Sequence, residues 1–475
     1  MKWLPRCLLV LCFVSLAPQL SPVHAAAARS CDAADPLLRS NLPAVLAARS
    51  GSPSHLLIHW YQRLARHQQA AEAARAQDGD WPAGEQNPYR LRQARLMLNR
   101  GLPRDAERAL RSLREPLTPE DIETRQTLLA VSLMQQQRFA ATVETLEDTQ
   151  GFPRSSLYNH FNLATSLIGR GSPLEGMALL DELGMVTAED AAVLTLRDRA
   201  NLALGWTWLN LNEGASARHM FKRVRLSGLH SNMALLGLGW SELAPEGTPQ
   251  RIAFKRELRC ADVQTAPKSV RLLLFKSSHC RPSDKPSMFS FHHSFAFEPG
   301  ALGAARFRRA LAPWHELGRR DAQDPAVQEA LLATGYAYEQ LGASAQARSA
   351  YQTAVQAYEK EMKRLDALQT NLRGSESDPA ALITEQTYSE EFGSLGNRPP
   401  FTQALTDLES LRQCIERRDA SHPRRPALIA THEALQVLLH RQALDDLSER
   451  RKRLQTYLTR ARLGLAAMNE TDLTR

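Results

Sequence analysis

The sequence predicts an all-α protein built from stacked helix pairs, with long helices at its C-terminal end. Groups of small and large apolar residues recur about every 34 residues between positions 88 and 360, a period typical of helical repeats. No strand-like alternation of apolar and polar residues competes with this pattern in that range. Of the 475 residues, 43% are hydrophobic and 23% charged, which is the composition of a folded globular protein. A stacked array accommodates this length because its core grows along one axis.

Residues 1–25 have the features of a cleavable secretory signal. Two basic residues precede an apolar run over 7–17, and Val-His-Ala ends the segment at Ala25. A membrane-spanning anchor needs about 20 apolar residues, and Pro18 interrupts this run too early. We expect cleavage near Ala25, export to the periplasm of a bacterium and a mature chain without a membrane span.

Residues 26–87 are predicted to form an N-terminal helical cap, which solenoids need to cover the open end of their core. The stretch 79–84 is rich in turn-forming residues and interrupts this cap. Repeats then occupy 88–360, and the best of them starts at Leu331. In that unit Gly335 and Ala347 are small enough for two antiparallel helices to approach closely, while Tyr338 and Tyr351 fill the space between them. Gly342 is placed at the turn, where a positive φ is easily adopted by glycine.

This unit resembles a tetratricopeptide (TPR) repeat. Weaker copies occur in the same register, and the matching residues Ala130 and Ala164 lie 34 positions apart, the period of that family. The resemblance implies a right-handed TPR-like helical solenoid from an exported bacterial protein. It covers most of 88–360 but departs from the family at Glu359, where a closing proline is common.

One repeat is predicted to be interrupted by an insertion at about 245–303. Residues 236–240 read as its first helix and 307–314 as its second. The intervening segment is rich in Lys and Phe, in contrast to the rest of the chain. Insertions in solenoids map to loops on one face, often a binding face; a lineage-specific, poorly ordered insert is the alternative interpretation.

The C-terminal part is predicted to leave the repeat pattern. Residues 361–400 read as the end of an overlong helix followed by a linker, and 401–475 as a helical hairpin or coiled coil. Leucines spaced three or four residues apart predict a helix buried along one stripe. Its partner is either the preceding helix or a second subunit, so a homo-oligomer through the C-terminal helix stays open. The Arg-rich run at 450–453 is interpreted as a solvated helix face, with phosphate or lipid headgroups as the alternative.

Catalytic and cofactor motifs are not found in the sequence. It contains no Gly-rich phosphate loop and no G-x-S-x-G, and His315-Glu316 and His432-Glu433 both lack the second histidine of a zinc-binding H-E-x-x-H motif. Acidic residues lie among arginines at helix-surface spacing, where ion pairs exposed to solvent are expected. We therefore expect no enzymatic activity, no catalytic residues, no metal and no cofactor.

Four cysteines remain after signal cleavage: Cys31, Cys260, Cys280 and Cys414. An even number in an oxidising compartment suggests disulfides. A Cys260–Cys280 bond would close a loop within the insertion, with free thiols as the alternative. No local feature pairs Cys31 with Cys414.

The TPR resemblance implies that the solenoid groove binds an envelope protein or an extended peptide as an adaptor. Groove contacts in this family come from the first helix of each pair, which points to the polar residues Asn162, Thr165, Asn201, Thr207 and Gln340. The formal charge of +8 is too small to indicate nucleic-acid binding by an exported protein, and membrane contact is expected only through partners. The alternative function is an envelope glycan-active enzyme, or its regulatory subunit, on a helical scaffold.

Overall fold

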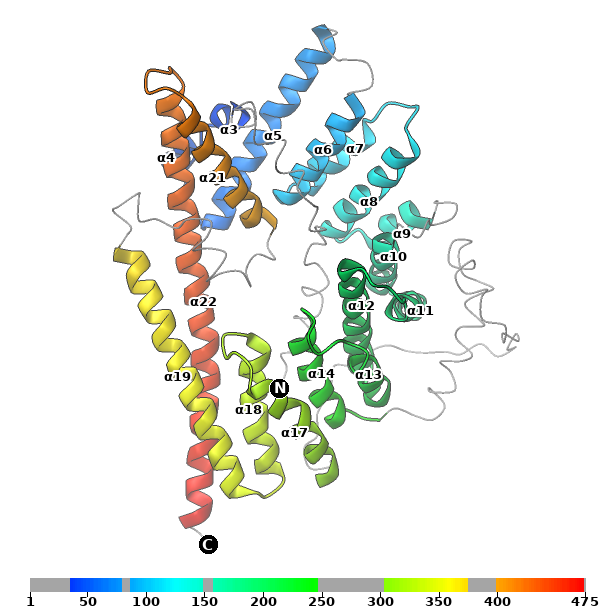
Figure 1. The fold of residues 1–475 in the computed structure, drawn as a ribbon, viewed down its shortest axis with the longest axis vertical. Coiled ribbons are helices and arrows are strands. Elements are labelled where there is room, and N and C mark those ends of the chain that lie inside the picture. The colour runs from blue at the N-terminus through cyan, green and yellow to red at the C-terminus, as the bar shows by residue number, and fades with distance from the viewer. Residues whose placement is uncertain (1–34, 79–85, 148–156, 247–302, 375–398, 474–475) are drawn as a thin grey trace, which may run out of the picture. The chain divides into compact units, whose positions relative to one another are not determined.

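The computed structural model describes residues 35–78, 86–147, 157–246, 303–374 and 399–473, and every secondary-structure element in these ranges is a helix (Figure 1). The all-α prediction is therefore confirmed for this part of the chain. The predicted signal segment and most of the predicted insertion and linker lie outside it. None of the described helices is long and apolar enough to span a membrane.

The described residues belong to two compact units. One, here called the repeat unit, contains the described residues of Phe139–Leu365 and Arg450–Arg475. The other, the terminal unit, contains those of Val14–Arg138 and Asp366–Glu449. Helices from the predicted N-terminal cap and from the predicted C-terminal hairpin thus share one unit. These units follow spatial packing, whereas the predicted domains follow the linear order of the chain.

The terminal unit combines helices from the N-terminal and C-terminal parts of the chain. Its helices are α3 (Asp35–Arg39), α4 (Leu42–Ala48), α5 (Pro53–Asp78), α6 (Gln86–Asn99), α7 (Pro103–Arg111), α8 (Pro119–Gln135), α21 (Pro399–Arg417) and the first part of α22 (Arg425–Leu473). Thr118 caps α8 by accepting a hydrogen bond from the N–H of Asp121, and Pro119 occupies the first turn, both typical of helix starts. The side chains of Trp60 and Tyr61 are fully buried on α5.

The repeat unit is a succession of helices, each packed against the next along the chain (Figure 1). They are α9 (Phe139–Glu147), α10 (Leu157–Arg170), α11 (Pro173–Gly184), α12 (Ala191–Asn210), α13 (Gly214–Phe221), α14 (Ser231–Leu243), α17 (Ala304–Gly318), α18 (Pro325–Gln340) and most of α19 (Ser344–Gly374), with the last part of α22. In addition, α10 contacts α12, α12 contacts α14, and α14 contacts α18. First helices therefore also pack on first helices, as expected for stacked pairs.

The turns that follow α6, α8, α10, α12 and α18 share one geometry. The residue with positive φ in each is Gly101, Gln137, Gly171, Asn212 and Gly342, respectively. In every case the next residue donates its N–H to the carbonyl five positions back, as in Ser172 to Leu167 and Ala343 to Tyr338. This is the Schellman motif, which satisfies the last carbonyls of a helix. The positive φ predicted for Gly342 is confirmed, and its recurrence shows a structural repeat.

Small residues let the paired helices approach closely. A Cβ on Gly335 would lie 2.4 Å from the Tyr351 ring, and one on Gly205 would lie 2.6 Å from the Phe221 ring. The predicted contact between Gly335 and Tyr351 is thus confirmed. Helices α14 and α17 pack directly against each other, with Trp314 of α17 fully buried against Gly239 of α14.

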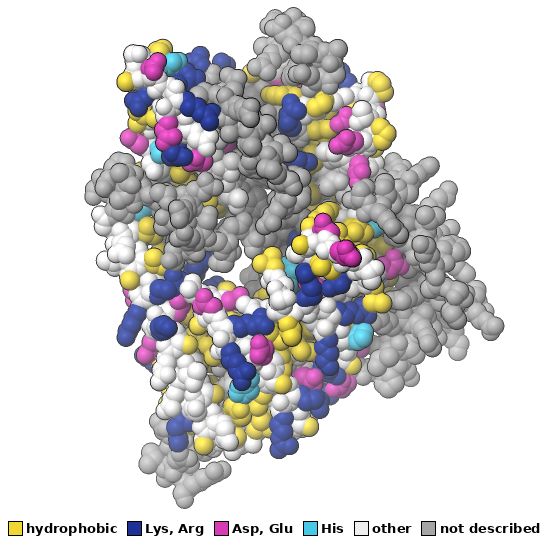
Figure 2. Space-filling view, viewed as in Figure 1, with side chains coloured by type: hydrophobic (Ala, Val, Ile, Leu, Met, Phe, Trp, Pro, Cys, Tyr) yellow, Lys and Arg dark blue, Asp and Glu magenta, His cyan; other side chains and the backbone are white. Residues whose placement is uncertain are grey.

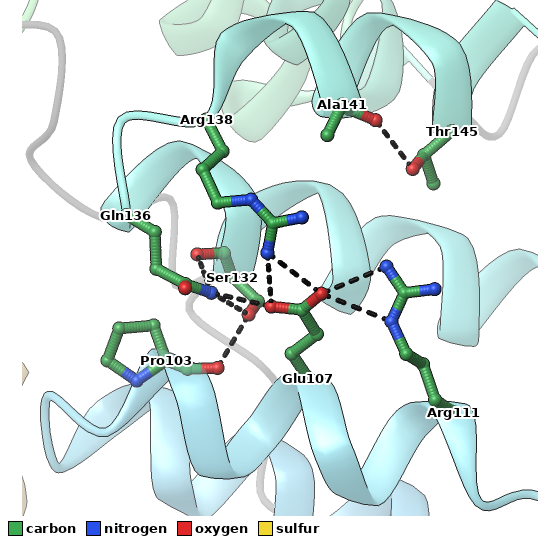
Figure 3. Close-up of polar contacts among 8 residues, drawn as sticks. All are labelled: Pro103, Glu107, Arg111, Ser132, Gln136, Arg138, Ala141 and Thr145. Carbon is green, nitrogen blue, oxygen red and sulfur yellow. Dashed lines mark hydrogen bonds and ion pairs between the residues drawn. The ribbon is translucent and has the colours of Figure 1, made fainter.

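Ion pairs connect consecutive helices within the terminal unit. Glu107 of α7 accepts hydrogen bonds from Arg111 at 2.9 Å, from Gln136 at 2.9 Å and from Arg138 at 2.9 Å (Figure 3). Burial alone would raise the pKa of Glu107, but these hydrogen bonds outweigh burial and lower its pKa. Ser132 donates to the Pro103 carbonyl at 2.7 Å. The end of α8 is thereby fixed to α7.

Candidate binding surface

The candidate site lies on α10 and α12, which are first helices of neighbouring pairs and contact each other. α12 begins at Asp190, whose carboxylate accepts hydrogen bonds from the N–H groups of Ala192 and Val193 at 2.7 and 2.9 Å. This cap fixes the start of the helix. Arg199 of α12 lies over the Phe161 ring of α10, with its guanidinium carbon 5.0 Å from the ring centroid, so the two helices are also joined by a cation–π contact.

Four of the five residues predicted to bind a partner lie on these two helices. Asn162 and Thr165 on α10 are 5% and 8% exposed, and Asn201 on α12 is fully buried. Thr207 is half-buried, and Gln340, at the end of α18, is exposed. The structure therefore brings Asn162, Thr165, Asn201 and Thr207 onto neighbouring helices and leaves Gln340 on another. Thr207 and Gln340 offer the most side-chain surface of the five.

Two of these side chains are used within their own helix. The Thr165 hydroxyl donates to the Phe161 carbonyl at 2.9 Å, and the Thr207 hydroxyl donates to the Ala203 carbonyl at 2.8 Å. Asn201 donates to the Gly184 carbonyl at 2.9 Å and so fastens α12 to the end of α11. Asn201 thus has a structural role that the sequence interpretation did not include.

A group of buried polar atoms on α10 and α12 has no hydrogen-bond partner among the described residues. Four of them, spread along the two helices, are here called the polar cluster: Oδ1 of Asn159 and of Asn201, and the indole Nε1 of Trp206 and of Trp208. The exposed fractions of these four residues range from 0% to 8%. The Asn201 Oδ1 lies against Gly184 of α11, and the Trp206 ring packs on Phe221 of α13. An unsatisfied buried donor or acceptor costs about 1–3 kcal/mol, so each of these atoms lowers the stability of the repeat unit unless another group satisfies it. The cluster combines two acceptors with two donors.

Salt bridges behind the polar cluster hold the turn between α13 and α14. Asp198 of α12 is 1% exposed at its side chain and pairs with Arg225 at 2.6 Å. Asp181 of α11 pairs with Arg223, also at 2.6 Å. Both buried carboxylates are thus paired with arginines that follow α13.

Burial shifts the pKa values of three titratable groups in the same region. It lowers the pKa of His160 and of His230 to about 4 and raises the pKa of Glu182 on α11 to about 7. Both histidines are therefore neutral at pH 7. Desolvation is the first cause of each shift and the sole cause for His160 and Glu182.

Glu182 gives the stability of the repeat unit a defined pH dependence. Its pKa is raised on folding from 4.5 to about 7, so the folded state retains the proton in that window and stability falls as pH rises through it. The lowered pKa values of His160 and His230 have the opposite effect below pH 6.5, where they make the stability of the folded state rise with pH. We expect Glu182→Gln to stabilise the protein at pH 8 by on the order of 1–3 kcal/mol and to change stability little at pH 5.

Urea unfolding of wild type and variant at pH 5 and pH 8 checks this prediction. Both proteins contain His160 and His230, so the contribution of the histidines cancels in the difference between their free energies of unfolding. The exposed Glu189 provides the control, and Glu189→Gln is expected to have no pH-dependent effect. An equal effect of Glu182→Gln at both pH values would contradict the assignment.

A second buried polar network lies in the terminal unit. Asp407 on α21 accepts hydrogen bonds from the Tyr61 hydroxyl at 3.0 Å, from Arg100 at 3.2 Å and from Gln403 at 3.1 Å. The Arg100 guanidinium carbon also lies 5.2 Å from the centroid of the Tyr61 ring. Burial, followed by the charge of Asp407, raises the pKa of Tyr61. The network connects α21 to α5 and to Arg100, which directly follows α6.

Comparison with known proteins adds no family. No family model matches the chain, and searches of curated proteins and of solved structures return no match. Within the described ranges no group of three or more His, Cys, Asp or Glu side chains is arranged to hold a metal ion.

Cys414 on α21 is 3% exposed and disulfide-bonded. The other five cysteines of the chain are at positions 7, 12, 31, 260 and 280, all outside the described residues. The Cys260–Cys280 bond expected from the sequence also falls outside them.

Proposed function

We propose that the protein is a non-catalytic interaction scaffold of the bacterial cell envelope, exported to the periplasm, with TPR-like helix pairs that bind an extended segment of a partner protein. The polar cluster on α10 and α12 is the observation that carries the proposal. Carbonyl oxygens of Asn159 and Asn201 accept hydrogen bonds, and the indole N–H groups of Trp206 and Trp208 donate them. A peptide backbone offers the complementary donors and acceptors at regular intervals.

The repeating turns support this proposal. A scaffold made of pairs that contact only their neighbours presents its first helices in a row. The first helices α10, α12 and α18 share the Schellman ending, whereas α14, between α12 and α18, ends at Ala244 in extended conformation. A partner segment lying along such a row would meet equivalent positions on consecutive repeats.

Capture of the partner tests the proposal. The tagged protein is exported in its own host, crosslinked and purified, and the captured proteins are compared between wild type and Thr207→Arg. We expect one dominant envelope protein with the wild type and at least tenfold less of it with Thr207→Arg, because a bulky cation is placed beside Trp206 and Trp208.

Thr145 on α9 gives a matched control. Like Thr207 it is half-buried, and its hydroxyl donates to a carbonyl four residues earlier, that of Ala141, at 2.8 Å (Figure 3). Thr145→Arg is expected to leave capture unchanged. Equal capture by wild type and Thr207→Arg would refute binding at this surface.

The oxidised state of Cys414 supports export, because disulfides form in the periplasm and are rare in the cytosol. We predict that its partner is Cys31. Cys31 precedes Asp35, the start of α3, by four positions, a reach of about 14 Å, and α3 lies in the same unit as α21. Cys7 and Cys12 belong to the predicted signal segment.

Mass spectrometry of peptides from the unreduced mature protein checks this pairing. The expected result is one crosslinked species that contains Cys31 and Cys414 and disappears after reduction. A bond from Cys414 to Cys260 or Cys280 would contradict the prediction, as would a free thiol at Cys414 in protein isolated from the periplasm.

A further inference from the structure

The last part of α22 packs antiparallel to α19 within the repeat unit. The rings of Tyr358 and Tyr457 lie with their centroids 6.0 Å apart, and a Cβ on Gly464 would lie 2.5 Å from the Tyr351 ring. Moving seven residues along α19 therefore corresponds to moving seven residues back along α22. Arg462 confirms the contact by pairing with Glu359 at 2.7 Å.

This register places two basic segments at the same level. Continuing it from the Tyr358–Tyr457 contact puts residues 360–364 of α19 beside residues 451–455 of α22, so the basic run at 450–453 overlaps this level. Glu359, Asp366 and Glu449 flank the two segments, which are KEMKR and RRKR and together contain seven cations and one acid, Glu361. That acid is engaged by Arg364 through two hydrogen bonds, at 2.8 and 2.9 Å.

The cations of these segments are accessible on both helices. Lys360 and Lys363 on α19, and Arg451 and Lys452 on α22, are exposed. We call these four residues the basic cluster. Figure 2 shows Lys and Arg side chains gathered over the middle of α19. Acids are also sparse along the helix, since residues 450–468 contain six Arg or Lys and no Asp or Glu.

One apolar side chain accompanies the cluster. Leu463 on α22 is 65% exposed and follows Lys452 by eleven residues, or about three helical turns. The two side chains therefore lie on the same stripe of the helix, about 16 Å apart along its axis. Thr456 and Thr459, also exposed, lie between them on this face.

We propose that the basic cluster docks the protein on an anionic membrane surface, through the phosphate groups of lipid headgroups. Charge complementarity selects this occupant: cations on two adjacent helices match an array of single negative charges. Each Lys or Arg held near an anionic leaflet contributes about 1 kcal/mol, and Leu463 can enter the boundary between headgroups and acyl chains. This contact is direct, in contrast to the indirect membrane contact expected from the sequence.

Vesicle flotation tests the proposal with the full mature chain. Vesicles of phosphatidylcholine with 30% phosphatidylglycerol are compared with vesicles of phosphatidylcholine alone. We expect flotation only with the anionic vesicles at low ionic strength, and loss of it in 0.5 M salt because such attraction is screened. A wild-type protein that stays unbound in both vesicle types at low ionic strength overturns the proposal.

A matched pair of variants locates the contact. The cluster variant Lys360→Gln/Lys363→Gln/Arg451→Gln/Lys452→Gln removes four charges. The control removes four exposed charges elsewhere: Arg104→Gln/Lys222→Gln/Arg308→Gln/Arg319→Gln. We expect the cluster variant to lower partitioning at least tenfold and the control to stay within twofold of wild type. An equal loss in both would show a bulk charge effect and overturn the proposal.

Two further measurements separate lipid docking from other outcomes. Leu463→Ser keeps every charge and leaves the buried helix stripe intact, so a few-fold loss of partitioning is expected from the missing apolar contact. Inorganic phosphate at 10 mM, added at constant ionic strength, should compete weakly, because it supplies single anions without a surface. Complete release by phosphate at that concentration would identify a free-phosphate site and contradict docking on a membrane.

Discussion

Asp407→Ala is expected to destabilise the terminal unit by about 3–5 kcal/mol, because it leaves the Arg100 charge buried without its partner. The side chains of Arg100 and Asp407 are 6% and 7% exposed, so water cannot replace the carboxylate. Tyr61 and Gln403 would lose their acceptor at the same time. The free energy of unfolding, measured by urea denaturation with a probe in this unit, checks the value.

Two controls distinguish the lost charge from a lost side chain. Asp407→Asn keeps an acceptor for Tyr61 and is expected to cost less than Asp407→Ala. Asp445 is exposed on α22, and Asp445→Ala is expected to change stability by less than about 0.5 kcal/mol. If Asp407→Ala were as mild as Asp445→Ala, the buried network would not hold α21 in place.

Trp314→Ala should destabilise the repeat unit by about 3–5 kcal/mol, the usual cost of removing a fully buried large aromatic side chain. Trp314 is 0% exposed, packs edge-on against Trp240 with ring centroids 5.0 Å apart, and lies against Gly239. Because α14 and α17 meet through this side chain, its loss would open a cavity between the two helices. Urea unfolding of the variant gives the measurement.

Leu463→Ala serves as the control for this substitution, since Leu463 is 65% exposed and little apolar area is lost. We expect a change below about 0.5 kcal/mol. A similarly small change for Trp314→Ala would mean that α14 and α17 do not form a packed pair across the segment that separates them in sequence.

Much of the helical architecture could be predicted because periodicity and small residues carry it. Gly335 with Tyr351 predicted a close helix pair, and Gly342 predicted the turn. The same turn at Gln137 and Asn212 was not predicted, because neither residue is glycine and the geometry depends on backbone hydrogen bonds. The pairing of α21 with α5 and α6 could not be predicted either, since it depends on contacts between residues about 300 positions apart, such as Arg100 and Asp407.

The candidate site was predicted only in part. The pattern of polar residues on first helices predicted Asn162 and Asn201 as binding residues. Both side chains are buried, and this burial depends on helix packing that cannot be predicted from sequence spacing. Asn159, Trp206 and Trp208 were missed as a polar group. Both tryptophans are buried, and their unsatisfied N–H groups are visible only in three dimensions. The basic run at 450–453 was noticed, but its alignment with Lys360 and Lys363 required the α19–α22 register.

Site-specific photocrosslinking in the living host tests the central claim most directly. A photoreactive residue is introduced at Thr207 or Gln340 on first helices and, for comparison, at Arg308 on the second helix α17. The account predicts that one envelope protein is captured from Thr207 and Gln340 and not from Arg308. Capture of only the protein itself, or the same captured proteins from all three positions, would contradict a scaffold that binds its partner along the first helices.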